Sequence, residues 1–592
     1  MTADHNYPYS SMRNNFLAIF SLTVCITSAQ GQERHPTTID SIYAPIRVAS
    51  IPSDAYIGLS MLETGEIRHY NYGEQADPGT LYLSSFDKGL TWKEVSYTPN
   101  MPFADVRSPL SKEYIRLFHA GSMGVYCIRT QGGIEGDRTL TKVADTQSIM
   151  LRPPVFTRQG RRVLVAGHGD VSPKGCYTYV SDNDGRTWQR SNIVTAPDHH
   201  PGGFHKGTRW NHGAVEPTVV ELKDGQLWML MRTAQDRHYE SFSEDGGLTW
   251  SESHPSVFYG TITMPTIGRL SDGRLLFFWC NTTPLPEMKT ATGVWDDVFT
   301  NRDAAHVAIS EDDGKTWQGF RELRLNPDRN DNHYASHSTG VDRSVHQSQF
   351  VEVAPGKILV ATGQHSLLRA MYLFDVRWLY EQERYNDFSD GLDQWCAFNY
   401  IKGIKGHCAY DRILGCSLER HPEHADRQIL HIKYEADTSL VADSRGAVWN
   451  FPAMRQGEFT TRIRIPKGSK GVSLLLNDRW MNPSDTVARY ECIYELKLDR
   501  KQLGIRDDGW HELSLRWNLS QATHACVFID GNRMRYTIPL KNSTCHGISY
   551  VHFIASPAAE NPGIYVDWVK AKANTLSKKN NQNTGRLFKK TE

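Results

Sequence analysis

Ser310–Trp317 carries the sequence SEDDGKTW, and three other segments of the chain repeat its pattern, S-x-[DN]-x-G-x-T-W. The other copies are SFDKGLTW at 85–92, SDNDGRTW at 181–188 and SEDGGLTW at 243–250. Ser, Asp and Asn side chains bond to nearby backbone in turns, and Gly adopts positive φ without strain. The Thr-Trp pair favours a strand whose indole packs inward. Each copy therefore predicts a turn that closes a β-hairpin.

The four tryptophans follow one another at intervals of 96, 62 and 67 residues. The shorter intervals suit one four-stranded sheet with its loops, and the longest suits about two such sheets. The repeat resembles the Asp-box, or BNR, repeat of the sialidase (neuraminidase) superfamily, which implies an all-β, six-bladed propeller. In that superfamily the Asp boxes lie on the rim, away from the active site, and non-enzymes carry them too. They therefore predict a fold and not a chemistry.

Alternating β-branched and aromatic runs extend through 43–380 and predict six blades, at 43–97, 105–150, 152–193, 213–254, 262–322 and 345–380. A polar stretch at 381–386 marks the expected boundary, and a second β-rich region follows at 387–573. Its runs at 459–465, 472–476 and 510–517 are typical of sandwich strands. This region resembles a concanavalin/laminin-G-type jelly roll, for which both glycan binding and a spacer role remain open. Residues 574–592 are rich in Lys and Asn and predict a disordered tail.

Composition and the N-terminus indicate an exported protein. The 592 residues include 66 basic and 66 acidic side chains, so no net charge attracts nucleic acid. The apolar run 16–26 follows Arg13 and precedes Thr27-Ser28-Ala29, which predicts a signal peptide at 1–29 and a secreted or periplasmic protein. A lipid anchor at Cys25 is the less favoured alternative. No other apolar segment is long enough to span a membrane.

Ten cysteines leave the redox state open. Six of them fall in the last third of the chain without a C-x-x-C spacing, which argues against a zinc site. One to three disulfides and buried free thiols are both compatible with export. Nothing in the sequence requires a metal or an organic cofactor.

Three arginines in sialidases clamp the substrate carboxylate, a task that suits planar bidentate donors. Glu216–Arg232, with the sequence EPTVVELKDGQLWMLMR, resembles the family's E-x-x-x-V-E-L-x-D-G-x-L-x-x-x-x-R strand pair. The resemblance makes Arg232 the second clamp residue and Glu216 the carboxylate beside the catalytic centre. Arg302, eight residues before Ser310, resembles the third arginine. Arg47 resembles the first, although Arg47-Val48-Ala49 stands where the family usually has R-I-P.

The general acid expected from the resemblance is an Asp in the loop after the first arginine. Asp77 is the preferred candidate, and Glu74 is the alternative. An Asp-Pro-Gly turn without a catalytic role also fits this segment.

The sequence departs from the sialidase pattern at the nucleophile. Sialidases carry a Tyr in a Y-S-x-L strand, and here Gln347 stands in that position, with His346 before it and Ser348 after it. Tyr334 in a neighbouring loop is a weaker substitute. Without a tyrosine, one scheme uses Asp77 or Glu74 as acid and Glu216 or His346 as base toward water, with inversion.

Aromatic and polar residues, including Trp210, His212, Trp279 and Trp295, are expected near the same site, where indoles could stack on sugar rings. His199, His200 and His205 lack carboxylates beside them, so we expect no metal site there. The sequence thus predicts an exported sialidase-like glycoside hydrolase that grips a terminal acidic sugar through Arg47, Arg232 and Arg302. Another glycosidase or a polysaccharide lyase is the first alternative, and a non-catalytic glycan-binding protein is the second.

Overall fold

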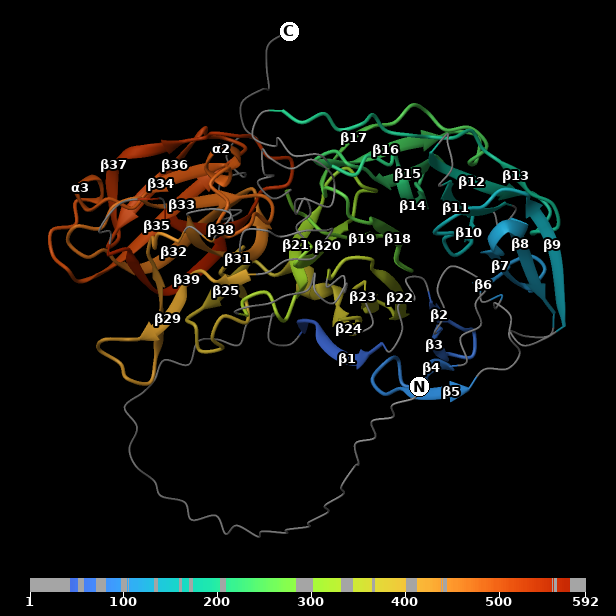
Figure 1. Cartoon of the computed structure of the whole chain (residues 1–592), viewed down its shortest axis with the longest axis horizontal. Coiled ribbons are helices and arrows are strands. Elements are labelled where there is room, and N and C mark those ends of the chain that lie inside the picture. Colours follow the sequence, from blue (N-terminus) through green and yellow to red (C-terminus); the bar gives the residue numbers. More distant parts are fainter. Residues whose placement is uncertain are drawn as a thin grey trace, which may run out of the picture. The chain divides into compact units, whose positions relative to one another are not determined.

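The computed structural model describes residues 43–574, with gaps at 52–57, 71–80, 97–103, 105, 132–136, 159–161, 170–173, 203–208, 284–301, 332–343, 365–367, 401–411, 438, 440–443, 556 and 558–561. The predicted signal peptide and nearly all of the predicted tail lie outside the described residues. The described part is built almost entirely of β-strands, as the sequence predicts (Figure 1). Within it, no helix has both the length and the apolar character that a membrane crossing requires.

The first part of the chain forms six antiparallel sheets of four strands each. The first three sheets are β2 (Leu59–Met61), β3 (Ile67–Tyr70), β4 (Leu81–Ser85) and β5 (Lys93–Ser96); β6 (Val106–Arg107), β7 (Tyr114–His119), β8 (Val125–Thr130) and β9 (Arg138–Ala144); and β10 (Val155–Phe156), β11 (Val163–Gly169), β12 (Gly175–Ser181) and β13 (Gln189–Arg190). The next three are β14 (Val215–Glu221), β15 (Leu227–Arg232), β16 (Arg237–Ser243) and β17 (His254–Tyr259); β18 (Thr266–Arg269), β19 (Leu275–Trp279), β20 (Ala304–Ser310) and β21 (Gln318–Leu325); and β22 (Gln349–Ala354), β23 (Lys357–Thr362), β24 (Ala370–Asp375) and β1 (Ile46–Ser50). Two 3-10 helices are η1 (Gly121–Met123) and η3 (Val376–Tyr380).

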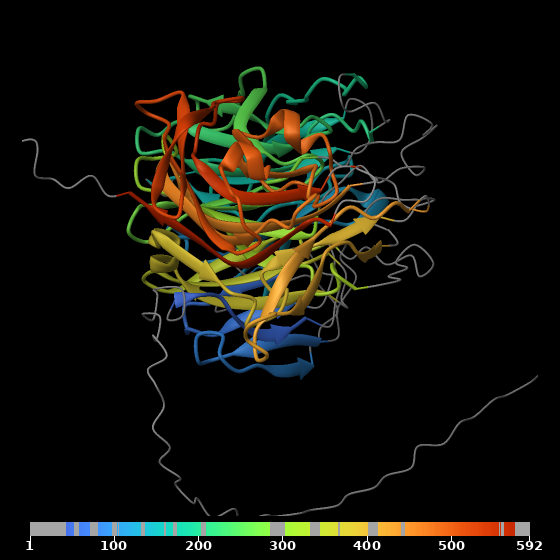
Figure 2. The ribbon, with the colours of Figure 1, turned by 90° about the vertical axis from the view of Figure 1, so that its left-hand side faces the viewer.

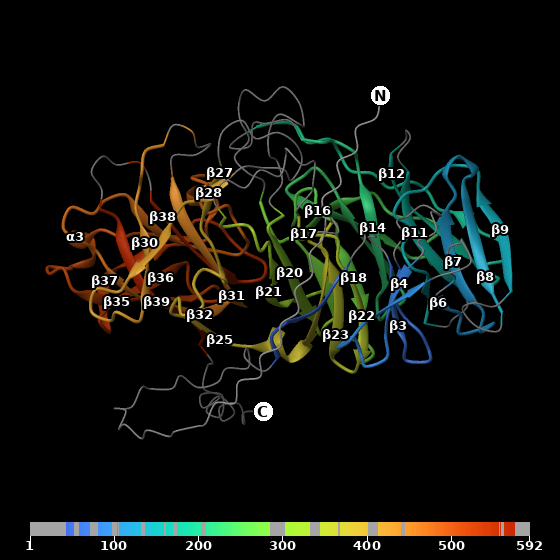
Figure 3. The ribbon, with the colours of Figure 1, turned by 60° about the horizontal axis from the view of Figure 1, so that its bottom comes forward.

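Apolar clusters join each of these sheets to the next and close the ring. Five clusters link the first sheet to the second and so on to the sixth. A sixth cluster returns to the start, because Leu359 and Met371 of the last sheet pack with Leu59, Ile67 and Leu83 of the first. This circular arrangement is that of a six-bladed propeller, and Figure 3 labels strands from each blade.

Strand β1 differs from its expected place in the first blade. It pairs with β24, so Arg47 lies opposite Tyr372 and Ser50 opposite Ala370. The first strand in sequence is therefore the outer strand of the last blade. Periodicity alone could not reveal this, because a strand's alternation does not identify its partner.

The four Asp boxes form the predicted turns. In the third copy, Asp245 Oδ1 accepts hydrogen bonds from the backbone N–H groups of Leu248 and Thr249 at 3.0 and 2.9 Å. Ser243 Oγ accepts from the N–H of Gly247, whose φ is +92°. Equivalent contacts occur at Asp87, Asn183 and Asp312. All four boxes follow the third strand of a blade, in blades one, three, four and five.

The second part of the chain is a sandwich of two antiparallel sheets, drawn in yellow to red (Figures 1 and 2). The larger sheet contains β29 (Ser417–Arg420), β30 (Gln428–Ile432), β39 (Ile564–Ala573), β32 (Gln456–Arg464), β35 (Trp510–Asn518), β36 (His524–Ile529), β37 (Asn532–Pro539) and β25 (Glu383–Asn386). The smaller sheet contains β26 (Trp395–Cys396), β31 (Arg445–Met454), β38 (Ile548–Ala555), β33 (Val472–Asn477) and β34 (Tyr494–Lys497). A separate pair, β27 (Phe398–Tyr400) and β28 (Arg412–Leu414), and two short helices, α2 (Ala488–Glu491) and α3 (Arg500–Leu503), complete it.

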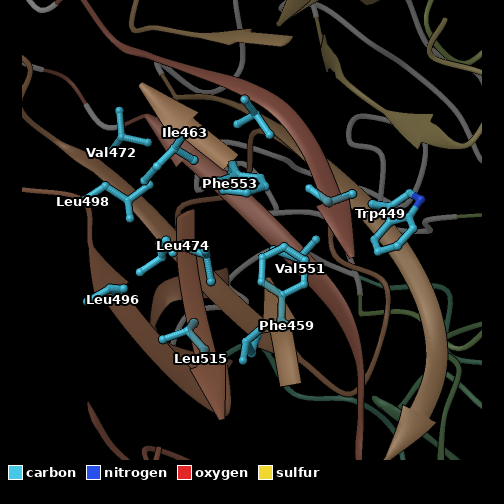
Figure 4. Close-up of a cluster of buried hydrophobic side chains, with 14 of the residues drawn as sticks. Trp449, Phe459, Ile463, Val472, Leu474, Leu496, Leu498, Leu515, Val551 and Phe553 are labelled. Atoms are coloured by element: carbon cyan, nitrogen blue, oxygen red, sulfur yellow. The ribbon is translucent and has the colours of Figure 1, made fainter. Parts of the chain in front are cut away.

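The sandwich has one large apolar core between its sheets. Phe459 and Leu515 from the larger sheet meet Trp449, Leu474 and Phe553 from the smaller one. Figure 4 shows these side chains lying between the strands. The alternation that predicted strands at 459–465, 472–476 and 510–517 therefore reflects burial of every second side chain on β32 and the placement of β33 and β35 against the same core.

Two further findings bear on the sequence analysis. The polar stretch 381–386 contains strand β25, because it pairs with β39 near the end of the chain. The eight described cysteines are all free thiols, so no disulfide occurs among the described residues.

Candidate active site

The candidate residues gather at the blade ends opposite the Asp boxes. Neighbouring strands of an antiparallel blade run in opposite directions. The start of the first strand, the end of the second and the start of the third therefore lie at the same end of the blade. Glu216 is the second residue of β14 and Arg232 the last of β15. An Asp box follows the far end of the third strand, so Glu216 and Arg232 lie at the opposite end of the blade from its Asp box.

Glu216 and Arg232 form a buried ion pair. Arg232 Nη1 donates to Glu216 Oε1 at 2.9 Å. The side chain of Arg232 is 7% exposed and that of Glu216 is 9% exposed. The register explains the contact, because Val215 pairs with Arg232 and the ladder is irregular between Val215 and Thr218. This bulge takes Glu216 out of the ladder and turns it toward the arginine.

The backbone is strained where the inner strands begin. Glu216, Ile262 and Gln347 have φ values of +50°, +50° and +64°, at the entries of the fourth, fifth and sixth blades. Such conformations are uncommon for residues other than Gly, and most so for a β-branched residue such as Ile262. Backbone strain of this kind gathers at functional sites, where surrounding contacts hold it in place.

The Glu216 carboxylate is ionised although it is buried. Burial by itself would raise its pKa, but the positive charge of Arg232, with contributions from His168 and Arg302, outweighs burial and lowers the pKa. Its second oxygen, Oε2, is buried and has no hydrogen-bond partner among the described residues. A buried anionic acceptor without a partner is costly, which makes this atom a place where a ligand or water would bind.

Arg152 and His168 hold the backbone of Glu216. Arg152 donates through Nη2 to the carbonyl of Glu216 at 3.3 Å and through Nε to that of Pro217 at 2.9 Å, and Nη2 also reaches the carbonyl of Pro265. The N–H of Glu216 donates to Nδ1 of His168 at 3.2 Å. Arg152 therefore ties the third, fourth and fifth blades together. No sequence motif singled it out, because its partners are backbone carbonyls distant in sequence.

Arg302 is buried and connects the fifth blade to the sixth. Its Nη1 lies 2.9 Å from Nε2 of His346 and 3.2 Å from Oε1 of Gln364, and its Nη2 contacts the carbonyl of Ile262. The N–H of Met264 donates to the other ring nitrogen of His346 at 3.4 Å. Both nitrogens of His346 are thus engaged and the residue is 1% exposed. This geometry favours a supporting role for His346 beneath Arg302 over the base role expected from the sequence.

Gln347 occupies the place where the resemblance implies a tyrosine. It is 3% exposed, and its Oε1 is a second buried acceptor without a partner among the described residues. An amide oxygen accepts a hydrogen bond but is a poor nucleophile, so this position supplies no phenol for a covalent step.

Arg47 does not join Arg232 and Arg302. It lies exposed on the outer strand β1, where its Nη2 donates to Ser50 Oγ at 2.7 Å. Its charge acts on Arg324, whose pKa is lowered first by burial and then by Arg47. Arg47 lies on the outer strand because β1 pairs with β24, with a bulge between Arg47 and Ala49. The remaining predicted residues of the site, Asp77, Glu74, Tyr334, His205 and Trp295, lie outside the described residues.

Trp210 is an exposed indole beside the Glu216–Arg232 pair. The residue is 39% exposed, and its ring centre lies 5.8 Å from the guanidinium carbon of Arg232. Asn211 holds its loop by accepting from the N–H of His199 at 2.8 Å and donating to its carbonyl at 3.1 Å. His212 packs edge-on against the indole, and burial with the charge of Arg232 lowers the pKa of His212 to about 3.

Other candidate positions fit less well. Trp279 is buried among aromatic side chains of the fourth and fifth blades. A cavity of about 620 Å³ lies at the Asp-box end, where Glu113 binds Arg129, Arg186 and Gln131. Its charged groups already pair with one another, and it lies at the opposite strand ends from Glu216.

His421, Glu423 and His424 in the sandwich are close enough to hold a metal ion. However, Nδ1 of His421 already accepts the N–H groups of Glu423 and His424, at 3.0 and 3.2 Å. Its Nε2 lies 3.7 Å from Asp567, whose carboxylate binds Arg427 and Arg462. Two arginines paired with the carboxylate beside His421 do not suit a cation site.

The comparisons with known proteins support the sequence-based resemblance. Residues 138–347 match the family model described as a BNR repeat-like domain, a range that includes Glu216, Arg232 and Arg302. This match agrees with the resemblance that the Asp boxes carry. The comparison with curated proteins found no match.

Solved structures similar to this chain include a sialidase, a protein named NanB and a protein of unknown function. Trypanosoma rangeli sialidase in complex with sialic acid is 12% identical, covers 90% of this chain and 94% of its own, and has a TM-score of 0.33. A Dyadobacter fermentans protein of unknown function is 16% identical over 56% of this chain and 99% of its own, with a TM-score of 0.36. NanB with Optactamide is 13% identical over 57% and 71%, with a TM-score of 0.37. At these values the structural likeness carries no argument about activity.

Proposed function

Because the chain carries a BNR repeat-like domain in an all-β propeller, we propose that it is a sialidase-like glycoside hydrolase that releases a terminal acidic sugar from a glycan. The observation that supports this most directly is the ionised, buried Glu216, whose Oε2 has no partner among the described residues. Arg232 and Arg302 surround it with positive charge. With two guanidinium groups and one carboxylate, the site has an excess of positive charge that a carboxylate-bearing sugar would balance.

Water is the proposed nucleophile. Gln347 provides no phenol, so the attack on the anomeric carbon comes from a water molecule whose proton passes to Glu216 as the C–O bond forms. The leaving oxygen takes a proton from an acid, for which Asp77 and Glu74 are the candidates. A single displacement of this kind inverts the anomeric configuration.

The low pKa of Glu216 limits its strength as a base. Its larger contribution would be electrostatic, because the transition state of glycoside cleavage develops positive charge on the sugar ring. Trp210 supplies an apolar surface for the sugar ring or the leaving group, since its indole is exposed next to Arg232.

The test is incubation of the protein with an α-sialoside and with uronate-bearing oligosaccharides, followed by proton NMR of the first product. We expect a released acidic monosaccharide with inverted configuration. Glu216→Gln should lower kcat by about 10²- to 10⁴-fold. Glu240→Gln is the matched control, because Glu240 lies in the same blade and binds Trp228.

The alternatives correspond to other outcomes of this experiment. An unsaturated product would identify a lyase, and binding without turnover would identify a glycan-binding protein. A fully active Glu216→Gln variant would remove Glu216 from the mechanism.

A further inference from the structure

The residue after Arg302 is joined to the C-terminal sandwich by a fully buried ion pair. Arg412, the first residue of β28, donates through Nη1 to Oδ1 of Asp303 at 3.1 Å, and both side chains are 0% exposed. Asn326 donates to the same oxygen at 2.9 Å. Arg412 Nη1 also reaches the carbonyl of Arg329, and its guanidinium lies 4.5 Å from the ring centre of Phe398.

The sandwich also contacts β19 and β20, the two strands between which the Arg302 segment lies. Asn281, just after β19, donates through Nδ2 to the carbonyl of Asp478 and accepts at its own carbonyl from the N–H of Trp480, both at 2.9 Å. His306 of β20 contacts the hydroxyl of Tyr550 at 2.5 Å. Both strands that flank the Arg302 segment are therefore bound to the sandwich.

An apolar cluster accompanies these polar contacts. Ala304 and Leu325 of the fifth blade pack with Phe398, Trp480 and Tyr550 of the sandwich. Strands β21 and β31 lie side by side, as Figure 3 shows. The two parts of the chain thus share a buried surface at Asp303 and Ala304, the two residues that follow Arg302.

The two adjacent charged side chains have separate partners. Arg302 contacts His346, Gln364 and the carbonyl of Ile262, all in the propeller, whereas Asp303 contacts Arg412 in the sandwich. Without Arg412, the buried Asp303 carboxylate would lose a cationic partner at the position that directly follows Arg302 in the chain. Arg412 therefore compensates a buried negative charge on the backbone segment that carries Arg302.

We propose that the C-terminal sandwich is a fixed part of the site and that Arg412 is a positioning residue, which holds Asp303 and so orients Arg302 for a substrate carboxylate. The inference rests on the proposed function for the identity of the ligand. This role differs from glycan targeting and from a spacer role, because the sandwich contacts Asp303, the residue next to Arg302.

The experiment compares Arg412→Met with Arg321→Met in the full chain. Arg321 is a close match, since it is buried, pairs with Glu381 at 2.8 Å, donates to the carbonyl of Trp378 and lies 4.5 Å from the ring centre of Trp378. Arg321 lies in the half of β21 that follows the Asp box, whereas Leu325 at the end of β21 packs near the Arg412 contacts. Both variants should lower the melting temperature. Only Arg412→Met should raise KM for an acidic glycan, by about tenfold or more, with a smaller change in kcat.

Conservative variants separate positioning from folding. Arg412→Lys should recover part of the affinity, and if Arg412→Met does not fold, the isosteric Asp303→Asn takes its place with the same expected rise in KM. Equal KM values for wild type and Arg412→Met would overturn the proposal, and so would an equal rise in Arg321→Met.

A failure of the proposed function gives a different result. If the wild-type protein neither binds nor cleaves any acidic sugar, the ligand assignment is wrong. Crystal structures of the two variants then decide the inference, because it requires a displaced Arg302 guanidinium in Arg412→Met and an unmoved one in Arg321→Met.

Discussion

The Glu216–Arg232 pair should couple the stability of the propeller to pH. Removing one partner of a buried ion pair costs about 3–5 kcal/mol, because the other charge stays buried. Glu216→Gln keeps the shape and an acceptor for Arg232, so we expect about 3 kcal/mol at pH 7, and about 3–5 kcal/mol for Arg232→Met. The double variant should lose about 1–3 kcal/mol less than the two single losses together, because neither charge is then left alone.

The pH dependence follows from the lowered pKa of Glu216. A carboxyl whose folded pKa lies below its unfolded value, about 4.3, stabilises the fold above that value. This contribution is lost as the pH falls through the folded pKa. The difference between wild type and Glu216→Gln should therefore be full at pH 7 and should shrink below about pH 4.

Calorimetric unfolding at pH 7 and at pH values below 4, at one scan rate, measures these differences. Arg516→Met is the control, because Arg516 pairs with Glu458 while 49% exposed, and such pairs contribute less than about 1 kcal/mol. The reasoning is refuted if Glu216→Gln unfolds like the wild type at pH 7, if the difference is independent of pH, or if the two single losses simply add.

Three further predictions concern binding, chemistry and the Asp boxes. Trp210→Ala should raise KM for the glycan about three- to tenfold with kcat retained, and Trp210→Phe should recover most of the affinity. Steady-state kinetics measure this, with Tyr490→Ala as the control because Tyr490 is also exposed. An unchanged KM in Trp210→Ala would contradict the prediction. Gln347→Tyr should give or increase cleavage of an α-sialoside with retained configuration, measured by NMR, and a variant no different from its parent would show that Gln347 does not occupy the nucleophile position. Ser243→Ala should destabilise the fold by about 1–3 kcal/mol, since it leaves the buried N–H of Gly247 without its acceptor. Calorimetry measures this loss, and kinetics on the same variant measure activity. A loss of kcat/KM larger than the loss of folded protein would contradict the placement of the Asp boxes away from the site.

Local motifs carried most of what the sequence could predict about the site. The spacing from Glu216 to Arg232 is that of a hairpin, so the two residues meet across β14 and β15 whatever the rest of the fold does. The distance to an Asp box predicts Arg302. The prediction for Arg47 rests on its resemblance to an R-I-P motif in the first strand, and that strand pairs with β24 as the outer strand of the last blade, more than three hundred residues later in the chain.

The sequence by itself determined the repeating unit of this protein. Four Asp boxes define hairpins through short-range hydrogen bonds, and the alternation of side chains defines the strands, since both depend on neighbouring residues. Only the tertiary structure decided which strand closes the ring, that Arg152 ties three blades together at Glu216, and that Arg412 reaches Asp303 from the sandwich. Those contacts join residues far apart in the chain, and burial and charge compensation in the folded state select them rather than any local pattern.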